Sequence, residues 1–256
     1  MAELAALGPY FVVESYPAGS PACPPWRPLG ELISDPAALA ARIGEVRARL
    51  AAAAGCPADG VEFRVAASVA QLGLCARLLS PVLGAAAAGW ALSIDTAQAR
   101  WIPALGGPFR LSLPELSLPE LSLPELSRPE LSLPDMAAGD GLPGAGAAAC
   151  LGLLAGPVGQ IVRVVEAMAV SPRVLWGNVA SAVSGAATMI AAARPDLAVA
   201  VAGVAATALR YPALAGTYRG SPGTGFRRRN CCLIYRLSSP GPGRYCGDCV
   251  LGPRPG

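Results

Sequence analysis

The chain contains no histidine and no lysine among its 256 residues, so all 20 of its basic residues are arginine. Without histidine there is no Ser-His-Asp triad, no histidine general base and no histidine-ligated zinc or Rieske-type centre. Without lysine there is no Schiff base and no P-loop lysine. These absences exclude most of the familiar hydrolytic and nucleotide-driven enzyme classes.

Aromatic residues are also scarce, at 5%, although hydrophobic residues make up 53% of the chain. Alanine, leucine, valine and glycine carry the apolar content, which favours helices that pack closely through small side chains. The sequence therefore predicts a mainly α fold with a small antiparallel β portion (α+β), helical in its N- and C-terminal parts.

No stretch of the sequence is a convincing membrane span. The apolar run Leu197–Leu209 is shorter than the roughly 20 residues that cross a bilayer, and Ala145–Val162 is interrupted by glycine and proline. The first residues lack the basic and apolar regions of a secretory signal. We expect a cytoplasmic protein without a transmembrane segment, and the pattern leaves peripheral contact with a membrane surface open.

The sequence divides into four regions. Residues 1–110 form an N-terminal region of helices and a small sheet, 111–146 a proline-rich repeat and linker, 147–220 a helical region, and 221–256 a cysteine-rich segment. Within the first region, residues 1–34 look irregular.

Several helices and strands can be placed within these regions. A helix is capped by Asp35 and stopped by Gly55, with Arg42 on its solvent side. Further elements are expected at the following positions: helices over 61–89, broken near Ser80-Pro81; strands at Ala91–Ile94, Ala99–Ile102 and Phe109–Leu113; and helices over 158–169, from Gly177-Asn178 to Pro195, and from Asp196 to Tyr211.

Residues 111–135 repeat the pentapeptide Leu-Ser-Leu-Pro-Glu with small variations in five copies. A proline at every fifth position removes a backbone donor and forces the preceding residue into an extended conformation, so neither a helix nor a central strand is expected. We interpret the repeat as an extended, surface-exposed insertion. A polyproline-II-like docking strip is the alternative.

Four of the eight cysteines, Cys231, Cys232, Cys246 and Cys249, lie in the last 26 residues. Four thiolates fit either a structural zinc site or an iron–sulfur cluster. Adjacent side chains of a strand point to opposite faces, so the vicinal pair chelates one ion poorly and suits two irons better. The run Cys232–Leu237 is expected to be a strand, followed by a turn that returns the chain to the pair. Zinc and two disulfides remain the alternatives.

Positive charge gathers beside these cysteines. From Arg219 onward the chain carries seven arginines and one acid, Asp248, a net charge of +6, so the remainder carries −3 against the total of +3. Aromatic residues between these arginines are few, and nucleic-acid binding is not expected. Of the remaining cysteines, Cys75 and Cys150 are expected to be buried thiols.

At the cysteines the chain resembles FhuF-type ferric siderophore reductases. The resemblance rests on Cys-Cys, Leu-Ile-Tyr-Arg-Leu and Tyr-Cys-Gly-Asp-Cys, and a second match is the segment Ser171–Ser181, which contains Leu-Trp-Gly-Asn. It implies a [2Fe–2S] cluster on Cys231, Cys232, Cys246 and Cys249. The loop Leu233–Tyr245 is longer than is usual in that family, and the pentapeptide insertion is atypical.

The resemblance also implies a function. The protein would reduce ferric siderophore iron to ferrous iron by one-electron outer-sphere transfer, without an acid–base catalytic residue. Its electron donor would be a protein of the ferredoxin or flavin/NAD(P)H reductase type. Arg227, Arg228 and Arg229 would attract the anionic ferric complex or an acidic donor, Trp176 would shield the cluster, and Asn178 would cap a helix.

Two alternative functions stay open. One is a [2Fe–2S] electron-transfer module with a different acceptor. The other is a zinc-stapled helical protein with an interaction role.

Overall fold

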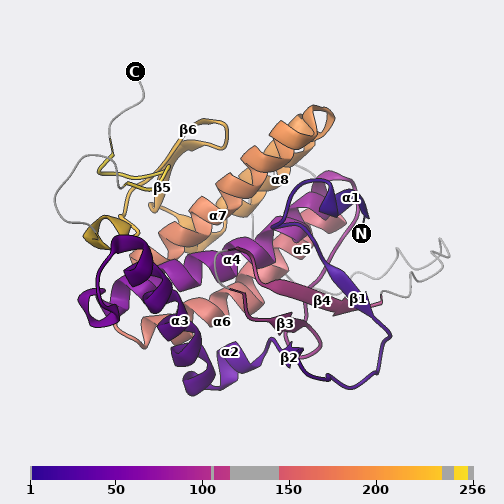
Figure 1. Ribbon diagram of the computed structural model, residues 1–256. Coiled ribbons are helices and arrows are strands. Elements are labelled where there is room, and N and C mark those ends of the chain that lie inside the picture. The colour runs from indigo at the N-terminus through magenta and orange to yellow at the C-terminus, as the bar shows by residue number, and fades with distance from the viewer. Residues whose placement is uncertain (1, 105–106, 116–143, 238–244, 253–256) are drawn as a thin grey trace.

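The structure is a computed structural model that describes residues 2–104, 107–115, 144–237 and 245–252, and it is mainly helical with two small sheets (Figure 1). The predicted fold class is confirmed. The α-helices are α1 Ala2–Ala5, α2 Glu31–Ser34, α3 Pro36–Ala54, α4 Phe63–Ala87, α5 Ala145–Leu153, α6 Gly159–Glu166, α7 Pro172–Ala193 and α8 Ala198–Leu209. The strands are β1 Glu14–Tyr16, β2 Arg27–Pro28, β3 Arg100–Ile102, β4 Arg110–Pro114, β5 Tyr218–Ser221 and β6 Thr224–Arg228. Short 3₁₀ turns cover Ala58–Gly60, Pro195–Leu197, Pro212–Leu214 and Ile234–Leu237, and a π turn, Leu154–Val158, joins α5 to α6.

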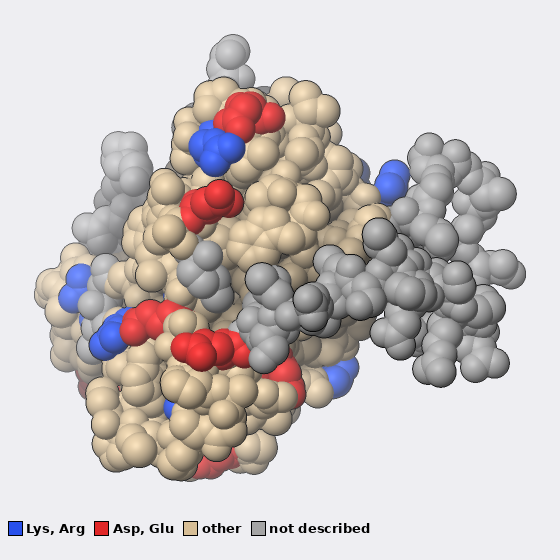
Figure 2. Space-filling model, turned by 90° about the vertical axis from the view of Figure 1, so that its right-hand side faces the viewer, with Lys and Arg blue, Asp and Glu red and all other residues tan. Residues whose placement is uncertain are grey.

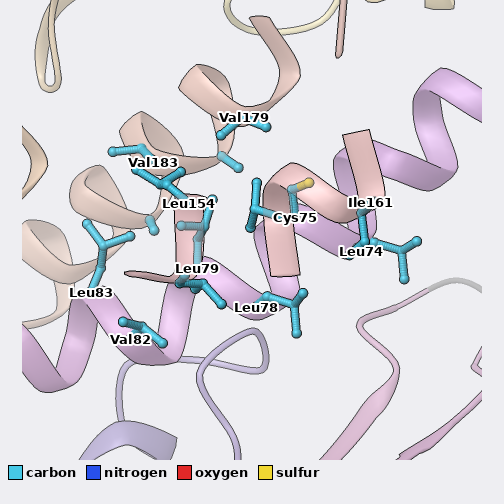
Figure 3. Close-up of a cluster of buried hydrophobic side chains, with 14 of the residues drawn as sticks. Leu74, Cys75, Leu78, Leu79, Val82, Leu83, Leu154, Ile161, Val179 and Val183 are labelled. Carbon is cyan, nitrogen blue, oxygen red and sulfur yellow. The ribbon is translucent and has the colours of Figure 1, made fainter. Parts of the chain in front are cut away.

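The longest helix, α4, lies at the centre of the molecule and packs against α3, α5 and α7. Its buried leucine and valine side chains meet those of α7 and of the α5–α6 segment, as Figure 3 shows for Leu79, Val183 and Leu154. Most residues of α4 are buried on every side, because neighbours surround it. The composition predicts helices that pack closely through small side chains. The helix α4 fits this expectation, since many of its buried residues are alanine, serine or glycine.

The predicted break at Pro81 is wrong, because α4 continues through it. Proline removes one helical donor and normally kinks a helix. Here Ser80, Pro81 and Val82 are all buried, and the Ser80 hydroxyl donates to the carbonyl of Ala76 at 2.7 Å. Tertiary packing on both sides of the proline therefore outweighs one missing hydrogen bond.

A four-stranded sheet of order β1-β4-β3-β2 covers one side of the helices. The β1–β4 pair is parallel and the other two pairs are antiparallel. Two of the strands come from residues 1–34, which were expected to be irregular, and the predicted strand Ala91–Ile94 does not form. The sheet is held to α4 by the buried guanidinium of Arg77, which donates to the carbonyls of Phe109, Tyr10 and Val12.

The first copy of the pentapeptide repeat belongs to β4, between β1 and β3. Leu111 and Leu113 are buried in the core, so the predicted exposure is wrong for this copy. The strand ends at Pro114. The copies from residue 116 onward lie outside the described residues, and the interpretation of an exposed insertion stays a prediction for them.

The helix α3 confirms the predicted boundaries. The Asp35 carboxylate accepts a hydrogen bond from the amide of Ala37 at 2.8 Å, and Gly55 ends the helix in the left-handed conformation with φ +66°. The solvent side was predicted wrongly for Arg42, which is buried and donates to the carbonyl of Ala104. Its guanidinium lies 5.9 Å from the ring centroid of Trp101, a contact that helical periodicity alone does not reveal.

Three helical segments, Phe63–Ala87, Ala145–Glu166 and Pro172–Ala193, are long and apolar enough to cross a membrane by length and composition. In the structure they pack against one another as the centre of the fold. Charged side chains are few on the face that Figure 2 shows and gather in small groups separated by wide uncharged surface.

The approach of α5 to α4 gives a prediction about small residues. A Cβ on Gly146 would lie 2.7 Å from the Cα and Cβ of Ala86, whereas a Cβ on Gly152, on the same helix, would meet nothing within 4 Å. We expect Gly146→Ala to destabilise the fold by about 1–3 kcal/mol through overpacking and Gly152→Ala to stabilise it by about 0.5–1 kcal/mol through helix propensity. Urea unfolding of both variants measures this, and equal midpoints would contradict the close approach.

Candidate metal centre

The C-terminal segment that contains the four cysteines lies at one end of the helical bundle, next to the β5–β6 hairpin (Figure 1). The hairpin leads directly into Cys231 and Cys232, and Cys246 and Cys249 return from the other side of residues 238–244, which are not described. Cys232 and Cys249 are buried, and Cys231 and Cys246 are half-buried. All four are free thiols.

The four thiols interact in two pairs. The Cys246 thiol donates a hydrogen bond to the sulfur of Cys232, and the Cys231 thiol donates to the sulfur of Cys249. Each pair takes one residue from the vicinal pair and one from the C-x-x-C motif. Among the described residues, no group of three or more histidine, cysteine, aspartate or glutamate side chains is arranged to hold a metal ion. Electrostatic interactions also link Cys231 with Cys232 and Cys246 with Cys249, so the four thiols interact with one another without surrounding a single point.

The chain turns immediately after the vicinal pair. Leu233 has a left-handed backbone with φ +72°, and Ile234–Leu237 form a 3₁₀ turn, so the predicted strand Cys232–Leu237 is wrong. The turn aims the amide of Leu233 back at the Sγ atom of Cys231, at 3.3 Å. A strand cannot make this contact, because its amides point sideways to neighbouring strands.

The C-x-x-C segment repeats the same local contact. Its knuckle is closed by a hydrogen bond of 3.0 Å from the amide of Cys249 to the carbonyl of Cys246. The amide of Leu251 then donates to the Sγ atom of Cys249 at 3.3 Å, again from two residues further along the chain. Amide donors of this kind stabilise thiolates and tune the potential of metal centres that thiolates hold.

Burial and local hydrogen bonds give Cys231, Cys232 and Cys246 different pKa values. The hydrogen bond from Cys246, the amide of Ile234 and the charge of Arg228 lower the pKa of Cys232 to about 6, against the opposing effect of burial. Burial raises the pKa of Cys231 to about 11. The hydrogen bond that Cys246 donates to Cys232, together with burial, raises the pKa of Cys246. Cys232 is thus a thiolate at neutral pH, the form that binds metals.

A buried polar network fixes the backbone of the vicinal pair to α4 and α7. The hydroxyl of Ser68 donates to the carbonyl of Cys232 at 2.9 Å. The side-chain amide of Asn178 donates in turn to the Ser68 hydroxyl at 3.1 Å, to the Ser68 carbonyl at 2.9 Å and to the side chain of Gln71 at 2.8 Å. The predicted role of Asn178 as a helix cap is wrong, since α7 begins at Pro172 and Asn178 lies inside it.

The C-x-x-C loop has its own attachment. The carboxylate of Asp248 accepts a hydrogen bond from the hydroxyl of Ser181 on α7, and its backbone carbonyl accepts one of 3.1 Å from the amide of Arg228 on β6. Both cysteine-bearing loops are therefore tied to the same helix, α7, and to the strand that precedes the vicinal pair. This shared support brings the two halves of the motif together.

The three consecutive arginines have different surroundings. Arg228 is 1% exposed, whereas Arg227 is half-buried and Arg229 is exposed. Arg227 donates to the carbonyl of Gly252 at 3.2 Å. The alternation follows from the strand: successive side chains of β6 point to opposite faces. Arg229, just past the end of β6 and two residues before Cys231, is exposed.

Trp176 packs on Tyr211, with ring centroids 5.8 Å apart, and it lies on the same turn of α7 as Gly177 and Asn178. Cys75 and Cys150 are buried thiols, as predicted, and burial raises the pKa of both to about 12.

Sequence reasoning missed Ser68, Gln71 and Ser181. Ser68 lies 164 residues from Cys232 along the chain, and no local pattern marks it. The burial of Arg228 did have a signal, because alternation in a strand would have separated it from its two neighbours. Using that signal requires a strand at residues 224–228, and no strand is predicted there from the sequence.

No protein-family model, no curated protein and no solved structure matches this chain.

Proposed function

We propose that the chain is an iron–sulfur reductase that converts ferric iron in siderophore complexes to ferrous iron in the cytoplasm. Cys231, Cys232, Cys246 and Cys249 would hold a [2Fe–2S] cluster. When bound, this group supplies a store for one electron. The residues of the chain hold it, balance its charge and present it to a docking partner.

The observation that carries the proposal is the contact between the two segments that resemble FhuF-type reductases. They are separated by about fifty residues of sequence, yet the hydroxyl of Ser181 donates to the carboxylate of Asp248 within Tyr-Cys-Gly-Asp-Cys. Asn230, directly before Cys231, also donates to the carbonyl of Arg173 at 3.2 Å. Asn178 also reaches the carbonyl of Cys232 through Ser68. Both segments that resemble FhuF-type reductases therefore contribute residues to one compact site.

The donor set fits two irons better than one zinc ion. A tetrahedral zinc site needs four sulfurs at about 2.3 Å from one point, which places every pair of sulfurs at about 3.8 Å. Among the described residues, no three of these side chains are arranged around one such point. Two of the thiols also receive backbone amide donors from Leu233 and Leu251.

The charge around the thiols also fits an anionic group. Arg228 is buried, and two of its nitrogens, Nε and Nη1, have no hydrogen-bond partner among the described residues. A buried cation without a partner costs several kcal/mol, and an anion held by the neighbouring thiols removes that cost.

The surface beside the site suits an anionic substrate or an acidic donor protein. Arg229 is exposed two residues before Cys231, and its charge attracts a negative partner from a distance. Electron transfer from the site to docked ferric iron needs no bond cleavage and no proton transfer, in keeping with a chain that has no histidine.

Anaerobic purification followed by iron, sulfide and zinc analysis tests the cofactor. Electron paramagnetic resonance of the reduced protein then distinguishes a two-iron cluster from other iron centres. We expect iron and sulfide in equal amounts, and ferrous iron on stoichiometric mixing of the reduced protein with a ferric siderophore. Zinc without sulfide would reject the proposal, and a cluster that reduces no ferric complex would leave an electron-transfer module with a different acceptor.

A further inference from the structure

Arg228 is a charged side chain that the fold buries against the candidate cysteine site without a carboxylate partner among the described residues. It is 1% exposed, and none of the six ion pairs that the described residues form includes it. Of the three guanidinium nitrogens, Nη2 donates a hydrogen bond to the carbonyl of Val174. Nε and Nη1 are left without a partner in the described part of the chain.

The surroundings hold the guanidinium in place. Gly177 of α7 lies against it so closely that a Cβ there would be 3.2 Å from Nη2 and 3.5 Å from Nε. Asp248 accepts a hydrogen bond from the backbone amide of Arg228 through its own backbone carbonyl, while its carboxylate accepts one from the hydroxyl of Ser181. The charge of Arg228 acts on the sulfurs of Cys232 and Cys246.

We propose that Arg228 is a positioning residue whose Nε–H and Nη1–H bind the sulfur-rich anion held by the four cysteines and make that anion easier to reduce. This inference rests on the proposed function. Reduction takes one electron from a protein donor of the ferredoxin or flavin class, and the same electron later passes to ferric iron, which becomes ferrous. No bond forms or breaks and no proton moves, so the site gains one negative charge that Arg228 stabilises.

The physical reason lies in the location of the charge. A fixed cation in a dry site stabilises the more negative, reduced state more than the oxidised one, and so raises the reduction potential. An exposed cation does so weakly, because water screens it. Arg228 and Arg229 are adjacent in sequence and equal in charge, but differ in burial. Variants at the two positions therefore distinguish the effect of a buried cation on the reduction potential from that of an exposed one.

The test is a potentiometric titration of Arg228→Gln and Arg229→Gln, followed by electron resonance, on protein whose iron and sulfide content has been measured. We expect Arg228→Gln to make reduction less favourable by at least about tenfold, which is about 59 mV for one electron. Arg229→Gln should change it much less. Equal shifts in the two variants, or an unchanged potential in Arg228→Gln, would overturn the inference.

A second variant covers the case in which Arg228→Gln fails to hold a cluster. Arg228→Met removes the charge without burying a polar amide, and it should lower the potential in the same direction as Arg228→Gln. A wild-type potential in Arg228→Met would then overturn the inference. Wild-type protein that lacks iron and sulfide would reject the proposed function and this inference together. A cluster whose reduction potential is the same in the wild-type protein and in both variants would reject the inference alone.

Discussion

Serine in place of Cys232 should give a protein that purifies without colour and loses most of its bound iron and sulfide. Cys232 is 2% exposed and already a thiolate at neutral pH, and its backbone is fixed by Ser68. A serine hydroxyl stays protonated at this pH and is a poor ligand for iron, so the site would keep only three thiolates. Iron and sulfide analysis after anaerobic purification, together with the visible spectrum, measures the loss.

Cys23→Ser is the matched control for that experiment. Cys23 is an exposed free thiol, and its replacement removes the same atom from the chain without touching the site. It should retain the iron, sulfide and spectrum of the wild-type protein. Wild-type cluster content in Cys232→Ser would contradict the assignment of this residue as a ligand.

The features that sequence predicted well are those that local chemistry determines. Asp35 and Gly55 mark the two ends of α3 because a capping carboxylate and a left-handed glycine act within a few residues. The end of α8 before Tyr211 is likewise marked by Pro212 in the sequence itself. Such signals need no knowledge of the rest of the fold.

The features that sequence missed depend on distant partners. Pro81 was expected to break α4, but the packing of other helices around it holds the helix together. Asn178 carries a residue type that caps helices, yet its partners Ser68 and Gln71 lie more than 100 residues away. Intrinsic preference is a weak guide wherever tertiary contacts supply a stronger interaction.

The candidate metal site shows both cases. The residue types of Cys231, Cys232, Cys246 and Cys249 and their spacing were enough to predict that they would meet. How they meet was not predictable, because the turn at Leu233 and the supports from α4 and α7 replace the expected strand and hairpin. The candidate site is thus specified in sequence by its four cysteines and in space by the helices that support the two loops carrying them.

Replacing Asn178 with alanine is expected to lower the free energy of unfolding by about 2–4 kcal/mol, because it removes one donor group that serves several buried acceptors. The Ser68 hydroxyl would lose its support and hold the carbonyl of Cys232 less firmly. Denaturant unfolding of the metal-free protein measures the first effect. The rate at which a chelator removes iron from the loaded protein measures the second, which should increase.

Thr188→Ala provides the comparison for Asn178→Ala on the same helix. The Thr188 side chain is exposed and bonds only to the carbonyl of Ser184 within its own turn, so its loss should change stability by no more than about 0.5 kcal/mol. If the two variants unfold at the same denaturant concentration and lose iron at the same rate, the network from Asn178 through Ser68 to Cys232 does not support the site. A large effect on iron release alone would instead show that the network acts on the cysteine loop and contributes little to the contact between α4 and α7.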